Sequence, residues 1–256
     1  MLLMIDAGNT RVKWSCISNE APLQFPPAWQ GVGSVLHQDL GQIAQSIAHY
    51  HITRCKISNV AGAGLQQSLE QLVRSHSPDI AIESFSAADP IAGVHNHYRE
   101  PIKLGADRFA SAIAAHYQFP DVDLVVATCG TATTIDAITA QGDFLGGMIL
   151  PGLQLMASAL AKNTAQLPQI AQHFELQDLF ANHTDQAIAS GCIHAQIGAM
   201  LCAVRDLERK RGNAKLIISG GAAPYLLPQL THCQAIDWQD VENLVLTGLW
   251  VAAKSS

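Results

Sequence analysis

The sequence predicts an α/β fold made of two similar halves. Apolar segments of strand length alternate with segments whose apolar residues recur at helical spacing, as in layered α/β proteins. A strand that runs into a polar, glycine-containing turn and then a hairpin occurs near the start and again after residue 120. The 256 residues can bury a sizeable core in one or two domains. We therefore expect two duplicated lobes, residues 1–118 and 119–256, with a boundary near Phe119 and Pro120.

The first half supplies the elements of one such lobe. Residues 1–6 and 11–17 predict two strands joined by a polar turn, and residues 21–33, rich in proline and glycine, predict a loop. Helices and strands then alternate, with a helix around residues 40–48, a strand at 56–60, a helix around 65–73, a strand at 80–85 and a helix that begins near residue 105.

The second half repeats the opening pattern. An apolar strand at residues 124–127 runs into the turn 128–134, and a hairpin follows that reverses at residues 141–143. The remaining elements are a short helix from 151 to 160, a long helix from 185 to 210, a strand at 215–219 that ends at Gly220-Gly221, and a closing helix from 241 to 253.

Composition narrows the class of protein. The formal net charge is −6 and there is no basic stripe, which argues against a nucleic-acid partner. The sequence contains no basic leader and no uninterrupted apolar run of membrane-spanning length, so we expect no membrane association. Six cysteines are scattered without a C-x-x-C pair, and we expect them to be reduced core thiols of a cytoplasmic protein.

The first polar turn, Asp6–Thr10, has the residue types of a phosphate-binding segment. Gly8 permits close approach of a ligand to the backbone, Asn9 and Thr10 offer side-chain donors, and Lys13 adds a cation. The Asp6 carboxylate could position Mg²⁺ through water, because Mg²⁺ binds carboxylates, water and phosphate oxygens. An ordinary hairpin turn explains this segment equally well.

Three strands of the chain end in glycine and hydroxyl residues, at 6–10, 130–134 and 219–221. Ligands of α/β proteins bind at the carboxyl ends of strands, so three such ends in two duplicated halves indicate a nucleotide held between lobes. The sequence has no Walker A motif and no G-x-G-x-x-G after a strand, so the nucleotide site is of another kind.

The pair Asp107-Arg108 follows a glycine-led turn at the start of a predicted helix. An aspartate in this place caps the helix and interacts with its dipole, and on spacing alone this is the stronger interpretation. The alternative is catalytic: Asp107 would accept the proton of an alcohol during phosphoryl transfer, and Arg108 would bind a carboxylate or phosphate.

The arrangement of the three turns resembles the superfamily of acetate kinase, sugar kinases, Hsp70 and actin. The resemblance implies two duplicated ribonuclease H-like lobes, each a mixed sheet flanked by helices, with an ATP cleft between them. It assigns residues 6–13 to the first phosphate segment, residues 130–134 to the second and Gly220-Gly221 to the adenosine segment.

Four motifs, in this order and spacing, are similar to those of type III pantothenate kinases, and the match covers essentially the whole chain. They are Asp6-Ala7-Gly8-Asn9-Thr10, Leu104-Gly105-Ala106-Asp107-Arg108, Gly130-Thr131-Ala132-Thr133-Thr134-Ile135-Asp136 and Gly147-Met148-Ile149-Leu150-Pro151-Gly152. The resemblance implies ATP-dependent phosphorylation of pantothenate to 4′-phosphopantothenate, the first step of coenzyme A biosynthesis, with Mg²⁺ accompanying ATP.

The resemblance also implies roles for individual residues. Asp107 is the expected proton acceptor. Pantothenate is expected to contact Tyr98, Gly105, Ala106, Asp107, Arg108 and Thr184, and ATP to contact Asp6, Ala7, Gly8, Asn9, Thr10, Arg11, Val12, Lys13 and Thr131. The family usually has an aspartate where this chain has Thr128, at the position that helps to bind a monovalent cation. The family's requirement for K⁺ or NH₄⁺ is therefore in doubt here, and Asp136 is a less obvious substitute.

Other features have simpler interpretations. The pair His95 and His97 has no third ligand at a telling distance and predicts a polar loop, and Cys129 is expected to be a packing residue. The small residues of the long helix allow close helix contact, and with the resemblance they favour a homodimer with pantothenate sites near the interface. Two other functions remain open: another small-molecule kinase of the superfamily, or a non-catalytic nucleotide-binding regulator.

Overall fold

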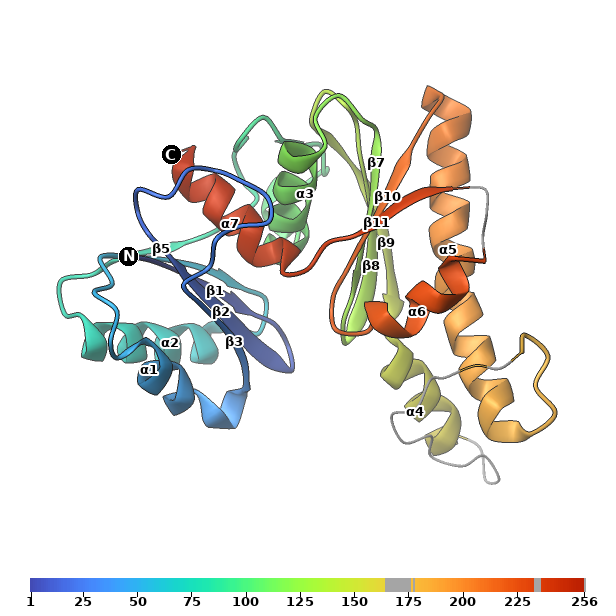
Figure 1. Ribbon diagram of the computed structural model, residues 1–256, viewed down its shortest axis with the longest axis horizontal. Coiled ribbons are helices and arrows are strands. Elements are labelled where there is room, and N and C mark those ends of the chain that lie inside the picture. Colours follow the sequence, from blue (N-terminus) through green and yellow to red (C-terminus); the bar gives the residue numbers. More distant parts are fainter. Residues whose placement is uncertain (164–175, 177, 233–235, 256) are drawn as a thin grey trace. The chain divides into compact units, whose positions relative to one another are not determined.

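A computed structural model describes residues 1–163, 176, 178–232 and 236–255. The chain forms two compact units, each with a β-sheet and packed helices (Figure 1). Unit 1 comprises Met1–Pro120, Gln141–Phe144 and Asn243–Ser256, and unit 2 comprises Asp121–Ala140 and Leu145–Glu242. The α/β class and the two-lobed organisation predicted from the sequence are confirmed.

Unit 1 is built on a five-stranded mixed sheet with the order β3-β2-β1-β4-β5. Strand β1 pairs antiparallel with β2 and parallel with β4, so the carboxyl ends of β1 and β4 lie at the same edge of the sheet. The strands are β1 (Leu2–Ala7), β2 (Arg11–Ile17), β3 (Gly31–Leu36), β4 (Arg54–Asn59) and β5 (Ala81–Ser84).

Helices cover both faces of this sheet. On one face, α1 (Gly41–Ile47) and α2 (Ala63–His76) bury Ile43 and Leu69 against Leu3, Ile5 and Ile57 of the strands. On the other face lie α3 (Ala106–Gln118) and α7 (Leu244–Lys254), which pack on each other and on the sheet (Figure 1). Since side chains alternate along a strand, the residues next to Leu3 and Ile5 in β1 point toward α3 and α7.

Helix α7 belongs to unit 1, although a division of the sequence at residues 118 and 119 places it with the second half. It packs closely on α3, where a Cβ on Gly248 would lie 1.8 Å from the carbonyl oxygen of Ala110. Only glycine permits this approach of the two backbones. The helix is apolar throughout, and its described residues from Leu244 to Ala253 are all buried.

The second sheet has the order β11-β10-β7-β8-β9-β6. Its strands are β6 (His95–Asn96), β7 (Leu124–Cys129), β8 (Ala132–Ile138), β9 (Asp143–Pro151), β10 (Lys215–Ser219) and β11 (Asp237–Asp240). Strand β7 pairs antiparallel with β8 and parallel with β10, and the order β9-β8-β7-β10-β11 repeats the order of unit 1. The structure thus confirms the duplication seen in the sequence. Strand β6 and the first two residues of β9 lie in unit 1.

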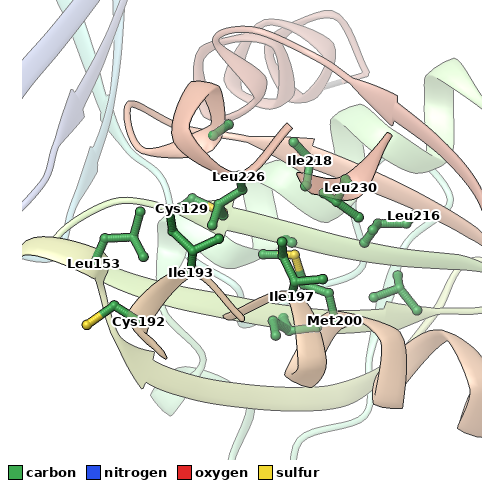
Figure 2. Packing of buried hydrophobic residues seen from close by; sticks show 14 of the residues in the cluster. Cys129, Leu153, Cys192, Ile193, Ile197, Met200, Leu216, Ile218, Leu226 and Leu230 are labelled. Atoms are coloured by element: carbon green, nitrogen blue, oxygen red, sulfur yellow. The ribbon is translucent and has the colours of Figure 1, made fainter. Parts of the chain in front are cut away.

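The core of unit 2 forms where helices pack on one face of β7, β8 and β10 (Figure 2). The helices are α4 (Leu153–Asn163), α5 (Thr184–Arg211) and α6 (Ala223–Leu230). Helix α5 places Ile193, Ile197 and Met200 against Leu216 and Ile218 of β10. By length and composition α5 could cross a membrane, although polar residues such as His194 and Gln196 interrupt its apolar sequence. Half of its apolar window is buried, as in the core helix of a soluble domain.

The structure contains a few elements that the sequence did not indicate, namely β3, β6, β11 and α6. Gly31 and Gly33 of β3 were assigned to a loop because glycine usually marks loops. Here they are glycine because Trp14 of the neighbouring strand lies over them: a Cβ on Gly33 would be 2.7 Å from the Trp14 indole nitrogen. Two short 3-10 turns, His37–Asp39 and Pro101–Lys103, complete the described elements.

The cysteines fit the expected reduced state in part. Cys16, Cys55, Cys129 and Cys192 are free and buried, as predicted. Cys202 is also free but exposed, because it lies on the face of α5 that points away from the core, so the prediction of a core position is wrong for this residue. Cys233 lies outside the described residues.

Candidate active site

The first polar turn joins β1 to β2 and carries a buried carboxylate at its edge. Asp6, at the end of β1, is only 9% exposed. Its partner in β2 is Lys13, and its partner in β4 is Ser58. Residues paired in this way point to the same face of a sheet, so the three side chains lie together on the face that bears α3. The Ser58 hydroxyl is fully buried and has no hydrogen-bond partner among the described residues.

The turn itself is a tight hairpin. The Gly8 amide donates to the Arg11 carbonyl at 3.1 Å, and the Gly8 carbonyl lies 2.8 Å from Nε2 of His37. The Arg11 guanidinium donates to the hydroxyl and the carbonyl of Ser34 in β3, at 2.8 and 3.0 Å. Asn9 and Thr10 are exposed at the tip. The side chains of Ala7 and Val12 point into the core on the opposite face, so only their backbones can meet a ligand.

The electrostatics distinguish this turn from an ordinary hairpin. The pKa of Asp6 is raised from 3.8 to about 7: burial raises it most, the nearby Asp107 charge also raises it, and Lys13 lowers it. A carboxylate held in such an environment is unfavourable for the folded protein, because its charge is desolvated. Strongly shifted carboxylates of this kind gather at functional sites.

Asp107 lies in the first turn of α3, close enough to Asp6 for their charges to interact. Its Oδ1 accepts a hydrogen bond from the Arg108 amide at 2.8 Å. Burial raises the pKa of Asp107, while this hydrogen bond and the Arg108 charge lower it. Gly105 makes room for the carboxylate, since a Cβ there would lie 2.7 Å from Oδ1. Asp107 therefore accepts a hydrogen bond from a helix-terminal amide and also lies within electrostatic range of Asp6.

Arg108 is turned inward, with a residue exposure of 6%. Its Nη1 donates to the Tyr98 hydroxyl at 2.7 Å. The guanidinium carbon lies 5.4 Å from the centroid of the Tyr98 ring and 5.7 Å from that of Phe144. The structure therefore brings together Tyr98, Gly105, Asp107 and Arg108, four of the residues predicted to bind the acceptor. Ala106 lies in the same helical turn.

In unit 2, two glycines from other segments pack on the chain at the second glycine turn: Gly152, and Gly220 of the third turn. The Gly152 amide donates to the Thr131 carbonyl at 2.9 Å, and a Cβ on Gly152 would lie 2.1 Å from the Gly130 carbonyl oxygen. Gly220, with φ of +105°, packs in the same way on the carbonyl of Cys129. The motif that ends in Pro151-Gly152 thus supports the turn that exposes Thr131.

Thr128 stands in β7 next to hydroxyl residues of both neighbouring strands, Thr134 of β8 and Ser219 of β10. Their side chains share one face of the sheet with Asp136, which is 2% exposed and lies two residues beyond Thr134 in β8. Among these four residues, Asp136 supplies the single carboxylate. Thr184, the other predicted acceptor contact, is the exposed first residue of α5.

Two alternatives to the predicted site have little support. His97 pairs with Asp143 at 2.7 Å, and no group of three or more His, Cys, Asp or Glu residues that could hold a metal occurs in the described part of the chain. Burial raises the pKa of the Cys129 thiol to about 12, so it is protonated and unreactive at neutral pH. Cys129 is a packing residue of the unit 2 core, as expected.

The sequence did not indicate Ser58 and Phe144 as residues of the site. Ser58 is an ordinary strand residue until the parallel pairing of β1 with β4 sets it beside Asp6. Phe144 is separated from Arg108 by 36 positions in the sequence, and only the fold brings its ring to the guanidinium. Apolar and polar residues alternate in residues 54–59, which places Ser58 on the face of the strand opposite its apolar residues. This is the one local pattern from which Ser58 could have been predicted as a site residue.

The duplicated lobes, with glycine turns at the ends of equivalent strands, define a two-lobed α/β protein of the fold predicted from the sequence. Solved structures support this fold. A provisionally assigned 2-dehydro-3-deoxygalactonokinase from Sinorhizobium meliloti is similar with a TM-score of 0.61 and 12% identity, covering 99% of this chain and 98% of that one. A provisionally assigned Baf family transcriptional activator from Campylobacter jejuni is similar with a TM-score of 0.58 and 20% identity, covering 98% and 97%.

Sequence comparison identifies the family. Residues 2–206 match the family model of type III pantothenate kinase. A type III pantothenate kinase of Herminiimonas arsenicoxydans is 49% identical over 255 residues, which cover 99% of this chain and 97% of the relative. The chain belongs to the type III pantothenate kinase family, and it is a phosphotransferase.

Proposed function

We propose that this protein transfers the γ-phosphoryl group of ATP to the primary hydroxyl of pantothenate, which gives 4′-phosphopantothenate and begins coenzyme A biosynthesis. The observation that carries the proposal is the close approach of two carboxyl groups with raised pKa, Asp6 and Asp107, beside the inward-turned Arg108. Family membership agrees with this assignment.

The first turn suits a metal-bound polyphosphate. A buried carboxylate, an adjacent cation and the unpartnered Ser58 hydroxyl are oxygen and nitrogen groups of the kind that hold Mg²⁺, its waters and phosphate oxygens. Asp6 would hold the ion through water, and Asn9, Thr10, Lys13 and Thr131 would bind phosphate oxygens, with the backbone of residues 7–12 lining the segment. When bound, Mg²⁺ neutralises the charge of the transferred group.

The acceptor would be bound through its carboxylate. Arg108 offers a planar guanidinium for bidentate contact, and Tyr98 and Thr184 offer hydroxyls. Gly105, which makes room for the Asp107 carboxylate, and Ala106 would line the pocket at the helix terminus. Asp107 would accept the proton of the pantoyl hydroxyl as the hydroxyl oxygen bonds to the γ-phosphorus, the bond from that phosphorus to the β,γ-bridging oxygen breaks, and ADP leaves. Its raised pKa brings its basicity closer to the operating pH. Alignment and charge stabilisation would supply most of the barrier reduction.

We propose that the requirement for K⁺ or NH₄⁺ is weak in this protein. A neutral hydroxyl at Thr128 binds a monovalent cation less tightly than the family's usual carboxylate does. Its strand partners, Thr134 and Ser219, are also hydroxyl residues and do not replace the missing charge.

We further propose a cytoplasmic homodimer that forms through α5. The exposed face of this helix carries small residues at spacings of three and four, which lets a second helix approach closely: Ala187, Gly191, Ala195, Gly198 and Cys202. Thr184 begins the same helix, so the acceptor contact would lie near the interface. Sedimentation equilibrium should give twice the chain mass of 27.4 kDa. A monomer at micromolar concentration would contradict this.

A coupled assay of ADP release, with and without pantothenate, tests the function. We expect release that depends on pantothenate. Acetate or a sugar replacing pantothenate would indicate another kinase of the superfamily, and nucleotide binding without turnover would indicate a regulator. Asp107→Asn should lower turnover by several orders of magnitude and leave ATP binding nearly unchanged. Asp79→Asn, at an exposed loop position of the same unit, is the control.

A further inference from the structure

The Arg108 guanidinium is held by two aromatic rings that meet edge to face. The ring centroids of Tyr98 and Phe144 are 5.9 Å apart with an interplanar angle of 63°. The guanidinium carbon lies within 6 Å of both centroids, which is the range of cation–π attraction. Tyr98 also accepts a hydrogen bond from Nη1. Phe144 is fully buried and contributes only its ring, so it can affect the acceptor only through the side chains packed on it, Arg108 and Tyr98.

Phe144 is fixed by backbone pairing rather than by its neighbours in sequence. The start of β9 pairs with β6, with Phe144 opposite Asn96 and Asp143 opposite His95. The His97 amide donates to the Phe144 carbonyl at 3.2 Å, and the His97 ring pairs with the Asp143 carboxylate at 2.7 Å. The segment that ends at Tyr98 is therefore attached to the segment that carries Phe144.

Asn96 fixes the other ring. Its Oδ1 accepts a hydrogen bond from the Tyr98 amide at 2.9 Å, and its Nδ2 donates to the carbonyls of Ala87 and Pro101 at 2.8 and 3.0 Å. One short strand thus sets the place of both rings, through side-chain bonds for Tyr98 and through strand pairing for Phe144.

We propose that Phe144 is a positioning residue for Arg108 and thereby determines the affinity for the acceptor's carboxylate. An arginine side chain loses much rotational freedom when it is ordered, and a guanidinium already fixed against a ring loses less of it on binding a carboxylate. The inference rests on the proposed role of Arg108 in binding the acceptor. The other proposed acceptor-binding residues of unit 1 lie between positions 98 and 108. Phe144 would join them from the second half of the chain, where the β8–β9 hairpin carries it.

Steady-state kinetics of Phe144→Leu test the proposal. The KM for pantothenate should rise about tenfold, while the KM for ATP and kcat at saturating pantothenate stay near the wild-type values. Phe85→Leu is the matched control, because Phe85 is a buried phenylalanine of the same unit that stacks on Phe109 and not on Arg108. Circular dichroism checks that both variants are folded.

His97→Ala provides a second variant at an exposed position, in case Phe144→Leu fails to fold. It removes the ion pair with Asp143 and should raise the KM for pantothenate by a few-fold. A double mutant isolates the mechanism: in an Arg108→Ala background, Phe144→Leu should leave the KM for pantothenate unchanged, because no guanidinium remains to be positioned. Isothermal titration with pantothenate should show the same pattern without turnover.

The proposal is overturned if folded Phe144→Leu binds pantothenate as tightly as the wild type, or if Phe85→Leu weakens binding as much. It is also overturned if the effect of Phe144→Leu persists in the Arg108→Ala background. If Phe144→Leu does not fold, an unchanged KM in His97→Ala overturns it. A wild-type protein that releases no pantothenate-dependent ADP refutes the proposed function itself, and that result is separate from any change in KM among the variants.

Discussion

Replacing Asp6 with asparagine is expected to make the folded protein more stable, and increasingly so as the pH rises. Burial raises the pKa of Asp6 from 3.8 to about 7 in the folded protein. The folded state therefore holds this proton more tightly than the unfolded state does. Tighter binding of this proton raises the free energy of unfolding. The contribution is fully present below pH 3.8 and is lost as the pH rises through about 7. Above that pH the folded protein carries a desolvated charge.

The size of the effect follows from the two pKa values. Because the pKa of Asp6 is raised by about three units, the free energy of unfolding is lower than at acidic pH by roughly 4 kcal/mol at pH 8 and by about 2 kcal/mol at pH 5. Asparagine has no charge to desolvate, so the advantage of Asp6→Asn in the free energy of unfolding should grow by about 2–3 kcal/mol between pH 5 and pH 8. The same substitution should abolish ATP-dependent activity, since it removes the proposed carboxylate for the metal's water shell.

Urea denaturation at several pH values measures this difference. Tryptophan fluorescence is a suitable signal for unit 1, which contains Trp14, Trp29 and Trp250. Asp79→Asn, which removes an exposed carboxylate of the same unit, should show no such growth with pH. Asp6 carries no desolvated charge in the folded protein if Asp6→Asn is no more stable than the wild type at pH 8, or if its advantage is the same at pH 5 and pH 8.

Three further substitutions test other parts of the site. Gly152→Ala should raise the KM for ATP at least tenfold and destabilise unit 2 by about 1–3 kcal/mol, because the added Cβ meets the Gly130 carbonyl. Gly64→Ala is the control: a Cβ there meets nothing within 4 Å, so neither the KM nor the stability should change. Gly105→Ala should lower kcat with little loss of stability, since only the movable Asp107 carboxylate is displaced, and an unchanged kcat would count against the role of Asp107. Wild-type activity should be the same in K⁺ and Na⁺ buffers, whereas the Thr128→Asp variant should turn over faster in K⁺ than in Na⁺. A strict K⁺ requirement of the wild type would contradict the interpretation of Thr128.

The local pattern of the sequence was sufficient where a feature depends on neighbouring residues. The apolar run before Asp6 and the glycine after it specify a strand that ends in a tight turn, and the same logic holds around residue 130. The helix that begins near Gly105 was also predictable, because its apolar residues recur at helical spacing. The repeat of this pattern in both halves was enough to predict the duplicated sheets.

Features that depend on packing were not predictable in this way. Gly33 lies in a strand because Trp14 covers it, and α7 joins unit 1 because Gly248 fits against Ala110. Neither contact leaves a periodic signal, since each involves residues that are distant in sequence.

The sequence by itself determined that a strand ends near Asp6 and that a helix begins near Asp107, and hence that both residues are placed at polar turns with small neighbours. Only the tertiary structure decided that the charges of these two carboxyl groups interact, that Ser58 lies beside Asp6, and that the Phe144 ring lies against Arg108. The physical reason is that turns and helix starts follow from short-range backbone preferences, whereas the pKa of a carboxyl group and the orientation of a guanidinium depend on burial and on strand pairing over many residues.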